Sequence, residues 1–213
     1  APVEEFERMK AVPGEDGTLK PGYEAAPLRT VDPIERMKEN RMEPITYTGD
    51  KGYKLGDVLD KKVTMEEFVA QLSDEDLICI FRGEGMCSPK VTPGTAAAFG
   101  GLTPELQEFG IPAACCTDGP SGLRFDCGTR AFSMPNGTLL GCTFDLPLVE
   151  DLYEMAGREM RQNRVDALLG PGMNIHRNPL NGRNFEYMSE CPILNYLAGA
   201  VEVEAMEKTG SHA

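Results

Sequence analysis

Two segments of the 213-residue chain concentrate side chains that could bind a polar ligand. The first segment, residues 117–124, reads Thr-Asp-Gly-Pro-Ser-Gly-Leu-Arg. The Asp118 carboxylate is a hydrogen-bond acceptor and the Arg124 guanidinium is a fork of donors, so the two could hold one ligand between them. A capped turn with a local ion pair explains the same residues equally well. A phosphate loop fits poorly, because Asp118 would repel the anion and no Gly-Lys-Ser/Thr sequence follows.

The second segment, residues 169–190, holds two arginines, four asparagines, one histidine and two glutamates between glycines and prolines. A rigid loop with so many donors and acceptors suits a polyhydroxylated ligand. The alternative is a structural loop in which His176 and Arg177 serve backbone carbonyls. For His176 taken alone, we favour the structural role.

Each segment follows a short apolar run that predicts a buried strand, 111–117 before the first and 165–169 before the second. Amphipathic helices alternate with these runs, which indicates a parallel α/β sheet. Ligands of such folds bind beyond the carboxyl ends of the strands. We therefore expect Asp118, Arg124 and Arg183 to lie on one rim.

Helix start signals are frequent from residue 64 onward. They are Thr64 with Glu67, Ser73 with Asp76, Thr103 before Pro104, Asp145, and Cys191 before Pro192. The last of these helices is expected over 192–208. The glycine-rich stretch 83–101 is expected to be a long loop. The triplet Asn136-Gly137-Thr138 is expected to form only a turn.

Residues 1–60 differ in composition from the rest of the chain, with many prolines and charged residues and only scattered hydrophobic residues. Only residues 33–42 suggest a short helix. This part has too little apolar content to fold by itself. The sequence thus predicts an irregular proline-rich arm over 1–60 and a globular α/β portion over 61–213.

Composition excludes several partners. The net charge is −13 and the sequence pI is about 4.6, so nucleic acid and anionic membrane surfaces are poor candidates. No apolar run approaches the roughly 20 residues of a membrane span. The seven cysteines lack the spacing of a zinc site, and Cys115-Cys116 reads as a buried strand pair. An odd cysteine count without a signal segment favours a reducing, cytoplasmic location.

Residues 64–213 resemble glycoside hydrolase family three, the β-glucosidase-like hydrolases. The second segment is similar to that family's Gly-Pro-Gly-x-Asn-Ile-His-Arg-Asn-Pro loop with its following Gly-Arg-Asn-Phe-Glu-Tyr. The Asp-Gly-Pro-x-Gly-x-Arg pattern resembles the family's first sugar-binding turn. The resemblance implies the first few units of a (β/α)₈ barrel, incomplete in this chain. The leader resembles that of members with reversed domain order, in which the barrel follows another domain.

By this resemblance Asp118 accepts hydrogen bonds from the outer hydroxyls of the sugar in the −1 subsite. Arg124 supports that contact, and Arg183 also binds the sugar. It also implies exo-acting hydrolysis of terminal β-linked sugars by a retaining double displacement, with no metal or cofactor. The substrate would be a glucoside or β-linked gluco-oligosaccharide. None of the matched residues is the nucleophile or the acid/base. These groups are expected in the remainder of the barrel and in a second domain, so the chain alone is expected to be inactive.

One departure from the family pattern is Cys191, which stands where an aspartate is usual. Cys191 precedes Pro192 at a helix start, where aspartate caps better by about 1 kcal/mol. The rival interpretation of the whole chain is a non-catalytic sugar-binding or scaffold fragment that acts with a partner chain. A nucleotide-binding domain is excluded by the first segment, because Asp118 would repel a phosphate and no Gly-Lys-Ser/Thr sequence follows.

Overall fold

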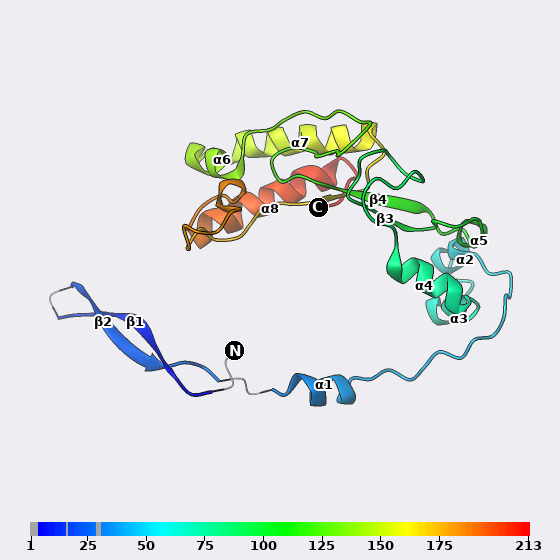
Figure 1. Cartoon of the computed structure of the whole chain (residues 1–213), viewed down its shortest axis with the longest axis horizontal. Coiled ribbons are helices and arrows are strands. Elements are labelled where there is room, and N and C mark those ends of the chain that lie inside the picture. Colours follow the sequence, from blue (N-terminus) through cyan, green and yellow to red (C-terminus); the bar gives the residue numbers. More distant parts are fainter. Residues whose placement is uncertain (1–3, 16, 29–30) are drawn as a thin grey trace. The chain divides into compact units, whose positions relative to one another are not determined.

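The computed structural model describes residues 4–15, 17–28 and 31–213 (Figure 1). Contacts between residues divide the chain into two compact units, Ala1–Ile45 and Thr46–Ala213. Each unit has its own secondary structure. None of the helices in the described part of the chain has the length and apolar character needed to cross a bilayer.

The first unit holds a β-hairpin and one short helix. Strand β1 (Glu7–Pro13) pairs antiparallel with β2 (Leu19–Ala25), and α1 spans Pro33–Glu39. The Glu24 carboxylate accepts hydrogen bonds from Arg8 at 2.6 Å and from Lys10 at 2.8 Å across the hairpin. The helix confirms the prediction made for residues 33–42.

The hairpin corrects the prediction of an irregular arm. Pro13 ends β1 and Pro21 lies within β2, and both suggested interruption rather than a strand. A two-stranded ribbon has two free edges, so a proline whose missing amide points outward removes no ladder bond. Every residue of β1 is exposed. The strand therefore lacks the apolar alternation that identifies a half-buried strand in sequence.

The second unit alternates helices with a small sheet. Its elements in chain order are α2 (Leu55–Leu59), α3 (Met65–Ala70), α4 (Asp74–Arg82), β3 (Ala97–Gly100), α5 (Pro104–Glu108), β4 (Ala113–Asp118), α6 (Gly137–Thr143), α7 (Leu146–Gln162), β5 (Ala167–Leu169), the 3₁₀ turn η1 (Asn184–Glu186) and α8 (Pro192–Lys208).

The sheet has the order β3-β4-β5, and its described strands do not close into a barrel. Strands β4 and β5 are parallel, with Asp118 opposite Leu169, as the alternating pattern predicts. Strand β3 is antiparallel to β4 and lies in the stretch expected to be a loop. That expectation was wrong because β3 is short and glycine-rich. A Cβ on Gly101 would lie 1.9 Å from the Ile111 carbonyl oxygen, so glycine permits the close approach.

The helix starts follow the sequence signals closely. Thr64, Ser73, Thr103 and Asp145 each accept a backbone amide hydrogen bond at a helix N-terminus, and Thr64 and Ser73 do so within capping boxes. The sequence missed α6. Asn136, read as part of a turn, instead caps this helix by accepting from the Leu139 amide at 2.9 Å.

The core lies between the sheet and the helix pair α7 and α8, which run side by side (Figure 1). Tyr153, Met160 and Met206 are almost completely buried there. Gly157 lets the end of α8 approach α7, because a Cβ at this position would lie 2.5 Å from the Thr209 hydroxyl. Cys115 and Cys116 are both buried in β4, which confirms the predicted strand pair.

Candidate functional site

The two polar segments start at the same edge of the sheet. Asp118 is the last residue of β4, and its register partner Leu169 is the last residue of the parallel strand β5. Residues 118–124, from the first segment, therefore leave the sheet beside residues 170–191, which hold most of the second segment. We call them the Asp118 turn and the Arg183 loop.

The Asp118 turn is closed by short-range hydrogen bonds among residues 117–124. The Gly119 amide donates to Asp118 Oδ1 at 2.9 Å, and the Arg124 amide donates to the Asp118 carbonyl at 2.8 Å. The Thr117 hydroxyl donates to the Arg124 carbonyl at 2.7 Å. Gly119 has φ +121°, and a Cβ there would lie 1.9 Å from the Gly122 carbonyl oxygen. Only glycine fits at this point, and the turn presents the Asp118 carboxylate at the edge of the sheet.

Arg124 pairs more closely with a residue that the sequence reasoning missed. Its Nη2 lies 3.1 Å from Asp126 Oδ1, whereas Nη1 lies 3.8 Å from Asp118 Oδ2. The side chain of Arg124 remains 63% exposed. The arginine thus bridges two carboxylates while keeping donors free for a ligand. The signal for Asp126 was its position two residues after Arg124.

The Arg183 loop is anchored by a side chain of α6 and by one of its own side chains. The Thr138 hydroxyl of α6 lies 2.9 Å from the Tyr187 carbonyl, and His176 Nε2 lies 2.8 Å from the same oxygen. His176 therefore has the structural role that the sequence favoured for it. A Cβ on Gly137 would lie 2.4 Å from the Glu186 carbonyl oxygen, so a glycine in α6 lets the loop pack tightly.

Arg183 forms an ion pair with Glu186, one helical turn further along the loop. Glu186 is only 8% exposed, while the Arg183 side chain is 63% exposed. The hydrogen bond that Arg183 donates to Glu186 raises the pKa of Arg183, and the negative charge of Glu186 adds to the shift. Arg183 and Asp118 belong to segments that leave the same edge of the sheet. The sequence noted Glu186 but gave it no role, although a spacing of three residues suits such a pair.

These side chains are better suited to binding a polyhydroxylated ligand than to cleaving a bond in it. One carboxylate and two largely exposed guanidinium groups offer an acceptor and several donors, which matches the vicinal hydroxyls of a neutral sugar. Of the neighbouring carboxylates, Asp126 and Glu186 are already paired with arginines. Within the described ranges, no group of three histidine, cysteine, aspartate or glutamate side chains is arranged to hold a metal ion.

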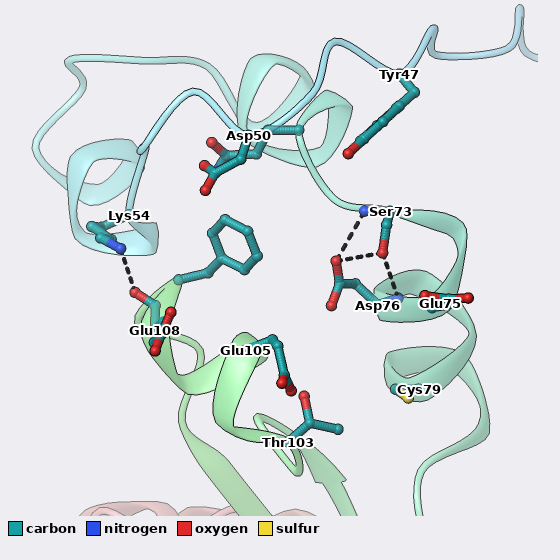
Figure 2. Close-up of a pocket in the computed structure, with 12 residues that line it drawn as sticks. Tyr47, Asp50, Lys54, Ser73, Glu75, Asp76, Cys79, Thr103, Glu105 and Glu108 are labelled. Carbon is teal, nitrogen blue, oxygen red and sulfur yellow. Dashed lines mark hydrogen bonds between the residues drawn. The ribbon is translucent and has the colours of Figure 1, made fainter.

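A separate hollow of about 430 Å³ is lined by residues of α4 and α5 and of the segments that precede α2 and follow α3. Figure 2 shows acidic side chains facing it from different segments, among them Asp50, Asp76 and Glu105. Lys54 lies at its edge and donates to the Glu108 carbonyl at 2.6 Å. No residue of the Asp118 turn or the Arg183 loop lines this hollow.

Comparisons with known proteins agree with the motifs. A curated β-glucosidase from Ruminococcus albus is 56% identical over 210 residues, which cover 99% of this chain and 22% of that protein. The crystal structure of a β-glucosidase from Paenibacillus barengoltzii matches all of this chain and 23% of its own, with TM-score 0.91 and 52% identity. β-Glucosidase 3B of Thermotoga neapolitana, solved in complex with glucose, matches 68% of this chain and 21% of its own, with TM-score 0.60 and 32% identity. No family model matches the chain.

The chain spans less than a quarter of the length of these relatives. The likeness to the Ruminococcus protein nevertheless runs through nearly the whole chain at more than half identity. It includes both loops at the carboxyl edge of the sheet, which the family resemblance singled out. The solved relatives share the same backbone arrangement at well over a quarter identity. The chain belongs to glycoside hydrolase family three.

Proposed function

We propose that the intact protein is an exo-acting, β-glucosidase-like hydrolase that removes terminal β-linked sugars with retention, and that this chain supplies part of its glycone-binding pocket. Asp118 accepts hydrogen bonds from the outer hydroxyls of the sugar in the −1 subsite. Arg124 and Arg183 donate to the same ring. The names of the relatives support the activity, and the glucose bound by the Thermotoga protein supports the sugar class.

The observation that carries this proposal is that the segments holding Asp118 and Arg183 leave the sheet at the same edge. They are separate in sequence, yet β4 and β5 end side by side. Ligands of parallel α/β folds bind at this edge. An acceptor and a donor held there from two rigid loops favour a ligand with several hydroxyl groups.

The bond-breaking groups are proposed to come from outside this chain. A retaining glycosidase needs two carboxyl groups about 5–5.5 Å apart across the scissile bond. Asp118 lies 3.8 Å from Arg124, and Asp126 and Glu186 are each paired with an arginine. These pairings suit positioning of the sugar ring rather than attack on its anomeric carbon. The chain alone would then bind weakly and hydrolyse nothing.

We further propose that residues 61–213 are the first βα units of a (β/α)₈ barrel, preceded by an arm over 1–60. The rest of the barrel and a second domain would complete the enzyme, in the reversed domain order that the leader resembles. Contacts place residues 46–60 with the second unit, and the buried Gln71 accepts from the Lys51 and Tyr53 amides at 3.1 Å each. Seven free cysteines in the structure suit a cytoplasmic location.

The proposal is tested by titrating glucose into the intact protein that carries this chain. Asp118→Asn and Arg183→Gln should each weaken binding by about tenfold or more, since each removes a charge-assisted hydrogen bond. Asp151→Asn, a change on the exposed face of α7, is the matched control and should bind as the wild type does. Unchanged affinity in both site variants would refute the assignment. Binding without hydrolysis of any β-glucoside would favour the scaffold interpretation.

A further inference from the structure

Two exposed cysteines from separate segments lie in contact. The Cys127 thiol donates to Cys87 Sγ at 3.5 Å, although the two residues are 40 positions apart in the sequence. Cys87 lies between α4 and β3, and Cys127 follows the Asp118 turn. Both cysteines are free and exposed. The S–S length of a disulfide is about 2.05 Å, so the two sulfurs need to approach by only about 1.5 Å to bond.

Backbone hydrogen bonds hold the two segments together independently of the thiols. The Cys87 amide donates to the Thr95 carbonyl at 3.0 Å, and the Asp126 amide donates to the Gly94 carbonyl at 2.9 Å. A Cβ on Gly94 would lie 2.3 Å from the Cys127 carbonyl oxygen, so glycine permits this close approach. Residues 94 and 95 therefore connect the segments that carry the two cysteines, and the thiols are positioned before any bond forms between them.

The other cysteines are arranged differently. Cys115 and Cys116 are buried neighbours on β4, and a buried thiol is chemically inert because reagents do not reach it. Cys142 and Cys191 are exposed. Within the part of the chain that the structure describes, no other two cysteine sulfurs are hydrogen-bonded to each other. Cys87 and Cys127 thus combine access to solvent with a partner thiol in contact.

We propose that Cys87 and Cys127 are a reversible redox site, at which a small-molecule disulfide oxidises the pair and the new bond ties the segment before β3 to the segment after the Asp118 turn. The thiolate of one cysteine attacks the small disulfide, breaks its S–S bond, forms a mixed disulfide and releases one small thiolate. The thiolate of the other cysteine attacks the protein sulfur of the mixed disulfide and releases the second small thiolate. Each cysteine gives its proton to solvent, and each released thiolate takes one up. The cysteines lose two electrons, and the small disulfide gains them.

The disulfide would lie next to the candidate sugar site. Asp126, whose carboxylate lies 3.1 Å from the Arg124 guanidinium, immediately precedes Cys127. A cross-link at Cys127 restricts the motion of the segment that carries this ion pair. Any effect of oxidation on a ligand of Arg124 rests on the proposed function; the disulfide itself does not.

Disulfide mapping on the intact protein tests the redox site. The protein is incubated with oxidised glutathione, its remaining thiols are alkylated, and it is digested with trypsin without reduction. Trypsin cuts after lysine and arginine, so Cys87 falls in peptide 83–90 and Cys127 in peptide 125–130, with no other cysteine in either. Mass spectrometry should find these two peptides joined in most molecules, and dithiothreitol should separate them. Cys87→Ser should abolish the joined pair and leave Cys127 carrying glutathione. Cys142→Ser, which removes an exposed cysteine of α6, is the matched control and should keep the joined pair.

Hydrogen exchange measures the tie in the wild type. The amides of residues 124–129 should exchange several-fold more slowly in the oxidised protein than in the reduced protein, while those of the Arg183 loop exchange equally in both. Glutathione on each cysteine without a joined pair, equal joining of peptide 83–90 to other cysteine peptides, or equal exchange in the two forms would overturn the proposal. Glucose titration separates the two proposals: binding that does not depend on Asp118 would overturn the proposed function alone, because the mapping uses no sugar.

Discussion

The Asp118 turn and the Arg183 loop lie beside each other and are held in different ways. The Asp118 turn is closed by short-range bonds among residues 117–124 and by one buried contact from Tyr153. The Arg183 loop depends on side chains, those of Thr138, His176 and Glu186. A carboxylate at the end of a strand can thus be fixed by a short glycine turn. An arginine far along a loop needs a partner side chain.

The largest expected effect concerns Glu202, a completely buried carboxyl group on α8. Glu202 has a folded pKa of about 8 and an ordinary value of 4.5, so on raising the pH the unfolded chain releases this proton first. Glu202 therefore lowers the free energy of unfolding as the pH rises from about 4.5 to about 8, by about 1.4 kcal/mol per pH unit. Denaturant titrations of wild type and Glu202→Gln at several pH values measure the difference. A constant difference between the two proteins would contradict the raised pKa.

A backbone change should damage the Asp118 turn while sparing the Arg183 loop. Gly119→Ala places a Cβ against the Gly122 carbonyl at φ +121°, and we expect a loss of about 3 kcal/mol in the free energy of unfolding. Glucose affinity should fall with it. Gly182→Ala is the matched control, because nothing lies within 4 Å of a Cβ there. Equal tolerance of both substitutions would show that the turn is not held by its backbone.

The reverse experiment weakens the Arg183 loop through a side chain. Glu186→Gln removes the charge that orients Arg183, and we expect a loss of about 1 kcal/mol in stability because the guanidinium is largely exposed. Glucose affinity should fall several-fold, while exchange in the Asp118 turn stays unchanged. Calorimetry and hydrogen exchange on one sample check both expectations. A change in the Asp118 turn of similar size would mean that the two segments are not supported independently.

The smallest effect lies at the end of the Arg183 loop. Cys191 caps α8 without a side-chain hydrogen bond, as the sequence predicted, and Asn195 instead donates to the Cys191 carbonyl at 3.1 Å. Cys191→Asp should stabilise the protein by about 1 kcal/mol, because aspartate accepts the free amides of the first turn and its charge suits the helix dipole. Paired denaturant titrations measure it. Cys191→Ser, which caps without charge, separates the two contributions, and no gain from either would contradict the cap.

Local signals in the sequence predicted much of this fold. Caps such as Thr64 and Asp145 act through neighbours three residues away, so they need no tertiary information. Strands β4 and β5 were recognisable as apolar runs, and their parallel pairing followed from the alternation with helices. The exposed strands β1 and β2 have no such pattern, and β3 depends on a close approach at Gly101 that only the folded chain reveals.

The candidate site was predictable in part for the same reason. Asp118 and Arg183 could be placed at one edge because each follows a strand in sequence. Their partners Asp126 and Glu186 required side-chain geometry, since several other carboxylates lie at similar spacing. Glu202 gave no signal at all: a glutamate on a helix reads as a solvated charge, and its burial depends on how α8 packs against α7.

The most direct test measures nitrophenol release from an aryl β-glucoside by the intact protein and by the purified 213-residue chain, each with its Asp118→Asn variant. The account predicts turnover by the intact protein, a loss of about a hundredfold or more in kcat/KM in its variant, and no release above background from the chain alone. Turnover by the chain alone that disappears in Asp118→Asn would contradict the account, because it would place the bond-breaking chemistry within these residues.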